Sequence, residues 1–161
     1  RRAARAGMAA DGEQTHLLAL IEASDPAGDR AATLAALDRM IADATLAPVY
    51  RDLAVLRRVL VGGAEVPLAD RRAALEPLAV AGRPYRLLAL EQLAYLMIEE
   101  GKAAEAIASL QGLIQEQGVS RSLQDRAGQM IMVLGGKPEM PAAAEAPAMD
   151  TDEDMEAGSD G

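Results

Sequence analysis

Apolar residues recur at spacings of three and four along most of the chain, which places them on one face of an α-helix. Leu34, Leu37, Met40 and Ile41 are one example. Gly and Pro interrupt the pattern at intervals and mark helix ends. The pattern therefore predicts an all-α protein, with helices over 13–24, 29–44, 48–61, 68–80, 85–100, 103–117 and 121–134. Ser120 is placed to cap the last helix, and residues 1–12 are expected to be the end of a truncated preceding segment.

The chain also repeats itself with a period of 35 residues. Tyr-Arg occurs at 50–51 and 85–86, and Leu-Ala occurs at 53–54 and 88–89. The intervening helices follow the same period with Leu75 and Leu78, then Leu110 and Leu113. One unit earlier, at a spacing of 38 residues, the corresponding pair is Leu37 and Met40. A fixed period with two helices per unit is typical of stacked helical hairpins, and an irregular helical bundle is the alternative.

One unit shows the letters of a known repeat. Gly101, Ala106 and Ile107 occupy the positions where the 34-residue tetratricopeptide pattern has a helix-closing Gly, a small residue and Ile. Ala94 is the small residue of the first helix, and Leu93 is the apolar residue before it. This resemblance implies a tetratricopeptide-like α-solenoid of about three helical hairpins over 13–135, with a C-terminal closing helix.

The chain as a whole resembles a bacterial family. The segments "LAPVYRDLAVLRRVL" (46–60) and "ALEPLAVAGRPYRLLALEQLAYLMIEEGKAAEAIASL" (74–110) are similar to tetratricopeptide-like ancillary subunits of the SecYEG translocon, in an alphaproteobacterial form. The resemblance covers about residues 12–135. It implies a periplasmic domain behind one inner-membrane helix, with the translocon and a membrane-anchored periplasmic chaperone of the prolyl-isomerase type as partners. The family has no catalytic residues.

Composition supports the helical prediction. Half of the residues are apolar, but Phe, Trp and Cys are absent, so a core must be built from Leu, Ala, Ile, Val and Met. The lack of Cys excludes disulfides and thiolate metal sites. No run reaches the ~18 apolar residues of a membrane-spanning helix. Because the chain begins with Arg1 rather than Met, we expect a piece of a longer protein, which leaves an upstream anchor or signal open.

The net charge of −9 is concentrated at one end. Residues 136–161 contain eight acids against Lys137 alone, a charge of −7, which leaves −2 for residues 1–135. The Ala, Pro and acidic composition of 136–161 predicts a disordered tail. No basic stripe is available to neutralise phosphates, so nucleic acid is not expected as a partner.

The sequence offers little catalytic chemistry. His16 is the only histidine, so neither a zinc site nor a nucleophile–base pair has a credible set of side chains. An ordinary packed or half-exposed histidine is the simpler interpretation. We therefore expect no enzyme, no cofactor and no metal.

A binding surface remains. In stacked hairpins the first helix of each unit lines the concave face, so the helix over 85–100 is expected to contribute Leu88, Glu91, Tyr95, Ile98 and Glu99 to a partner-binding groove. Tyr95 is either a partner contact or a filler between units. The predicted function is a protein–protein interaction scaffold, as the periplasmic part of a membrane-anchored protein that assists Sec-dependent export. The alternative is a soluble cytoplasmic helical-repeat adaptor unrelated to secretion.

Overall fold

The computed structural model describes residues 29–141, and this part of the chain contains helices and no strand. The α-helices are α3 (Arg30–Ala42), α4 (Pro48–Gly62), α5 (Leu68–Leu75), α6 (Arg86–Glu99), α7 (Ala103–Ile114) and α8 (Arg121–Val133). Two short 3₁₀ segments, η1 (Gly63–Glu65) and η2 (Glu76–Leu78), follow α4 and α5. The all-α prediction is confirmed for residues 29–141. The predicted helix over 13–24 and the segment 1–12 lie outside the described residues.

Local signals mark the starts of α3, α4 and α8. The Asp29 carboxylate caps α3 by accepting from the backbone N–H groups of Ala31 and Ala32. Pro48 occupies the first turn of α4, where a missing N–H costs nothing. The Ser120 hydroxyl accepts from the Leu123 N–H at 3.3 Å, so the predicted cap of α8 is confirmed.

The helix that departs most from its predicted length is α5. The helix expected over 68–80 ends as an α-helix at Leu75 and continues as a 3₁₀ turn over η2. Pro77 lies in that turn. A proline has no N–H for the α-helical ladder, and its ring disfavours another α-helical turn. α5 is therefore only 8 residues long, whereas α3 has 13 and α7 has 12.

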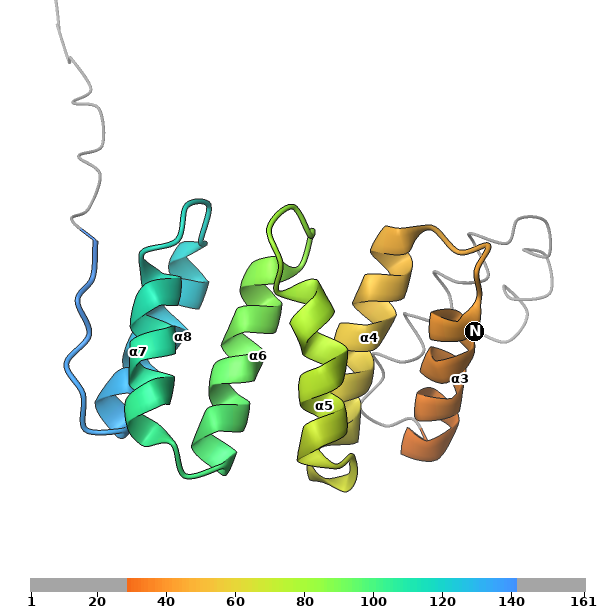
Figure 1. Ribbon diagram of the computed structural model, residues 1–161, viewed down its shortest axis with the longest axis horizontal. Helices are drawn as coiled ribbons and strands as arrows, with labels where there is room; N and C mark the ends of the chain where they lie inside the picture. Colours follow the sequence, from red (N-terminus) through yellow and green to blue (C-terminus); the bar gives the residue numbers. More distant parts are fainter. Residues whose placement is uncertain (1–28, 142–161) are drawn as a thin grey trace, which may run out of the picture.

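The helices stand side by side in chain order from α3 to α8, and each packs mainly against its neighbours in sequence (Figure 1). The starts of α5 and α7 are 35 residues apart, as are those of α6 and α8. The residues that correspond by sequence period are also equally buried. Leu37, Leu75 and Leu110 are each 0% exposed, and their partners one turn later are Met40, Leu78 and Leu113 at 2–3%. The sequence period therefore records which face of each segment is covered.

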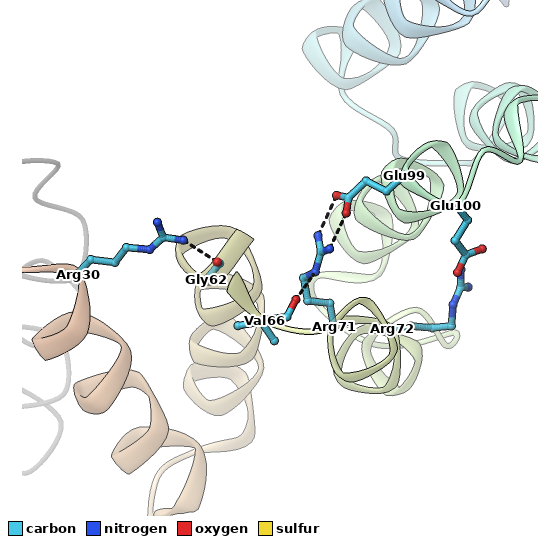
Figure 2. Close-up of polar contacts among 7 residues, drawn as sticks. All are labelled: Arg30, Gly62, Val66, Arg71, Arg72, Glu99 and Glu100. Atoms are coloured by element: carbon cyan, nitrogen blue, oxygen red, sulfur yellow. Dashed lines mark hydrogen bonds and ion pairs between the residues drawn. The ribbon is translucent and has the colours of Figure 1, made fainter. Parts of the chain in front are cut away.

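Arginine–carboxylate pairs join neighbouring helices where leucine packing ends. Arg71 on α5 is 6% exposed and makes a two-pronged ion pair with Glu99 at the end of α6, with N–O distances of 2.8 and 2.5 Å (Figure 2). Arg72 reaches Glu100 at 2.7 Å. A planar guanidinium matches the two carboxylate oxygens geometrically, which fixes the angle between the two helices.

The chain after α8 turns back along α7 (Figure 1). Gln111 on α7 and Gln115 directly after it donate to the Glu139 carbonyl at 2.7 and 2.8 Å. The Glu139 N–H donates to the Gln111 Oε1 at 2.9 Å. Met140 lies over Gly128, where an added Cβ would come within 3.4 Å of its sulfur. The predicted tail therefore does not begin as free chain at 136, because residues 137–141 form a strap across α7 and α8. Residues 142–161 lie outside the described part.

Removal of the strap is expected to lower stability modestly. A chain ending after Gly136 should be less stable than one ending after Pro141 by roughly 1–2 kcal/mol, because three hydrogen bonds and the Met140 contact are lost. Urea denaturation of the two truncated chains measures the difference. Equal midpoints for the two chains would show that the strap contributes nothing to folding.

Candidate interaction surface

Three of the five residues predicted to bind a partner share one groove. It lies between α4, α6 and α8, has a volume of about 330 Å³, and is lined by Leu56, Leu60, Leu88, Glu91, Gln92, Tyr95 and Arg126. Leu88, Glu91 and Tyr95 are thus brought together, whereas Ile98 and Glu99 lie outside the lining. We call this hollow the first-helix groove, after the helices that form it.

The sequence period explains why these helices share a face. One position of the 35-residue period is occupied in turn by Leu56, Glu91 and Arg126. Another is occupied in turn by Leu60, Tyr95 and Met130. Equivalent positions on equivalently packed helices point the same way. Leu60 is 50% exposed and Leu88 is 38% exposed, so the groove presents uncovered apolar surface. Counting 35 residues back from Tyr95 would have found Leu60 from the sequence alone.

Glu91 is already occupied. Its side chain is only 4% exposed and accepts two hydrogen bonds from Arg126, Nε to Oε1 and Nη2 to Oε2, each at 3.0 Å. The Tyr95 hydroxyl donates to the same carboxylate at 2.9 Å. Arg126 is 48% exposed, so the pair has one end in the protein and one in solvent. Glu91 is therefore a neutralised carboxylate at the base of the groove and no free acid for a partner.

The Tyr95 side chain is partly buried in the protein and partly open to the first-helix groove. Burial, and then the neighbouring Glu91 charge, raise the pKa of Tyr95 to about 12, so its hydroxyl remains a donor even in alkaline solution. The ring is half-buried and lines the groove. The ring therefore packs within the protein and also presents surface at the groove.

Neither Glu99 nor Ile98 lies in the groove, and Glu99 is bound to another side chain of the protein. Glu99 holds Arg71, which also donates to the Val66 carbonyl at 3.0 Å (Figure 2). The hydrogen bonds from Arg71 lower the pKa of Glu99. Ile98 is half-buried. Glu99 is exposed, but its carboxylate is held by Arg71 and lies outside the groove lining. Within the groove, the predicted residues that present surface are Leu88 and Tyr95, and Leu60 extends this surface onto α4.

The described residues contain no group of three or more His, Cys, Asp or Glu side chains that could hold a metal ion. His16 lies outside this part of the chain. Within residues 29–141, no helix is long and apolar enough to cross a membrane. Comparisons with protein families, with curated proteins and with solved structures find no match to this chain.

Proposed function

We propose that the protein is a non-catalytic interaction scaffold built as a tetratricopeptide-like α-solenoid. In this architecture α4–α5 and α6–α7 are hairpins, and α3 occupies the position of a second helix. The closing helix α8 occupies the position of the first helix in the next unit. The shared 35-residue spacing of helix starts and of buried leucines supports it. The first helices α4, α6 and α8 then line the face that stacking leaves free.

The observation that carries the proposal is the first-helix groove. Leu60 and Leu88 are apolar and substantially exposed there, and the one acid in the lining is neutralised by Arg126. A nucleic acid would find no unpaired cation among those lining side chains, and a charged peptide would gain no free counter-charge. An apolar segment of a partner protein suits the groove best, because it would cover the leucines and pack against the Tyr95 ring.

We place the protein at the bacterial inner membrane, on the periplasmic side, as an ancillary part of the SecYEG translocon that works with a membrane-anchored chaperone. This setting rests on the sequence resemblance of residues 12–135. A soluble cytoplasmic adaptor would use the same groove, so the identity of the bound partner separates the two settings.

Site-specific crosslinking tests both the groove and the setting. A photoreactive residue at position 60 or 88, in cells expressing the full-length gene, should crosslink to translocon subunits or to the periplasmic chaperone. Val80 is the control position, because it is 52% exposed and apolar but lies outside the groove lining. Crosslinks only to cytoplasmic proteins would favour the adaptor, and equal yields from position 80 would refute the groove.

A charge placed in the groove should separate binding from folding. Leu88→Glu is expected to reduce crosslinking from position 60 at least tenfold, because a partner would have to desolvate the new carboxylate. Its effect on stability should stay below about 1 kcal/mol, since Leu88 is already 38% exposed. Thermal melting of the same variant supplies the stability control.

A further inference from the structure

A second and larger hollow lies on the other side of α4. It has a volume of about 640 Å³ and lies between α3, α4 and α5. Arg51 lines this hollow and Leu60 lines the first-helix groove; the two are nine residues apart on α4, so they point about 180° apart. The apolar lining comes from Ile41, Val55, Ala73, Ala74, Pro77 and Leu78. Pro77, in the 3₁₀ turn that follows α5, contributes to one wall of the space.

Arg51 faces this hollow without a partner in the described part of the chain. Its Nε is buried and makes no hydrogen bond. The repeat shows what is missing, because Arg86 stands 35 residues later and makes a two-pronged ion pair with Glu116, at 2.9 and 2.7 Å. Glu116 lies in the segment after α7, whereas the corresponding segment after α5, residues 79–84, contains no acid. Arg51 thus has the position of an ion-pairing arginine and lacks the carboxylate.

A second set of polar atoms in the hollow is half satisfied. Asp52 is 5% exposed and accepts from Arg83 Nη2 at 2.6 Å through one oxygen. Its other oxygen and the Arg83 Nε are both buried without a hydrogen-bond partner. Such groups cost free energy unless something pairs with them. The lining contains three arginines and two aspartates, an excess of one positive charge. Arg58 is paired with Asp38 and Arg83 with Asp52, so the excess charge is that of Arg51.

We propose that this hollow binds an extended segment of a partner protein in which a carboxylate side chain adjoins apolar residues. The carboxylate pairs with Arg51 and takes the place that Glu116 fills in the next unit. The backbone of the extended segment supplies an N–H for the free Asp52 oxygen and a C=O for the Arg83 Nε. The apolar side chains cover Val55 and Pro77, which line the hollow and are not fully buried. An aliphatic carboxylate such as a fatty acid has no N–H to donate, so it would leave the Asp52 oxygen unpaired.

This site is independent of the first-helix groove, so the two proposals can fail separately. The probe is the peptide acetyl-Ala-Leu-Glu-Leu-amide, titrated into the full 161-residue chain by NMR. We expect saturable shifts with a millimolar or tighter Kd, and at least tenfold weaker binding of the same peptide with Gln in place of Glu. Octanoate is the second arm and is expected to bind at least tenfold more weakly than the peptide. Octanoate binding as tight as the peptide would overturn the choice of a peptide ligand.

Variants of Arg51 assign the contact. Arg51→Gln should weaken the peptide at least tenfold, and Arg51→Lys should fall between the two, because lysine keeps the charge but loses the planar fork. Arg86→Gln is the matched control, since it changes the equivalent arginine whose carboxylate partner is internal. It should leave peptide affinity unchanged. The proposal is overturned if Arg86→Gln loses as much peptide affinity as Arg51→Gln, or if a folded Arg51→Gln variant keeps its affinity. It is also overturned if the peptide does not bind at a concentration of about 10 mM.

Discussion

Leu110→Ala is expected to lower the free energy of unfolding by about 3 kcal/mol. Leu110 is 0% exposed and packs with Ala94 of α6, Ile114 of α7, and Ala127 and Ile131 of α8. Truncation removes its apolar contacts and leaves a cavity at the point where the three helices meet, which rigid backbones only partly refill. Urea denaturation measures the loss, and the thermal midpoint should fall by roughly 10 °C.

The repeat supplies matched variants for this measurement. Leu37→Ala and Leu75→Ala alter the equivalent, equally buried positions of the preceding units and should cost a similar amount. Leu60→Ala removes the same atoms from a side chain that is 50% exposed, so it should cost less than about 1 kcal/mol. A cost below 1 kcal/mol for Leu110→Ala would contradict the packing described for α6, α7 and α8.

Helix starts could be predicted closely because the signals are local. Asp29, Pro48 and Ser120 act on the backbone within one turn, so a single stretch of sequence contains the information. Helix ends were harder. The pattern continues past Ile114, but α7 stops there and the chain turns at Gly118, whose φ is +80°. At such points apolar spacing and turn geometry compete, and packing decides between them.

The residues predicted to bind a partner also divide into those that a local pattern predicts and those that depend on distant residues. The face of α6 follows from its period, which is why Leu88 and Tyr95 reach the groove. The roles of Glu91 and Glu99 depend on arginines 35 residues later and 28 residues earlier, and no local rule chooses among the arginines of the chain. The strap was missed for a related reason, since Gln111 and Gln115 bind the backbone of Glu139, which leaves no signature in its side chain.

The pairing of Glu91 with Arg126 predicts an asymmetric pair of mutations. Arg126→Leu is expected to destabilise the protein by about 3 kcal/mol, because it leaves a carboxylate that is 4% exposed with only the Tyr95 hydroxyl to bind. Replacing both residues with leucine should recover most of that loss. The residue that stands 35 positions before Glu91 is Leu56, which is 3% exposed. The equivalent position of the preceding unit therefore already accommodates a buried leucine.

A double-mutant cycle over Arg126→Leu, Glu91→Leu and the double variant measures the coupling directly. We expect the single costs to be far from additive, with a coupling of about 2 kcal/mol or more. High salt should reduce this coupling only in part, because Glu91 is buried although Arg126 is 48% exposed. Additive costs, or a cost of Arg126→Leu that vanishes in 1 M salt, would mean that water reaches Glu91 through the groove. The carboxylate would then be available to a partner, and a basic segment would become a better fit to the first-helix groove than an apolar one.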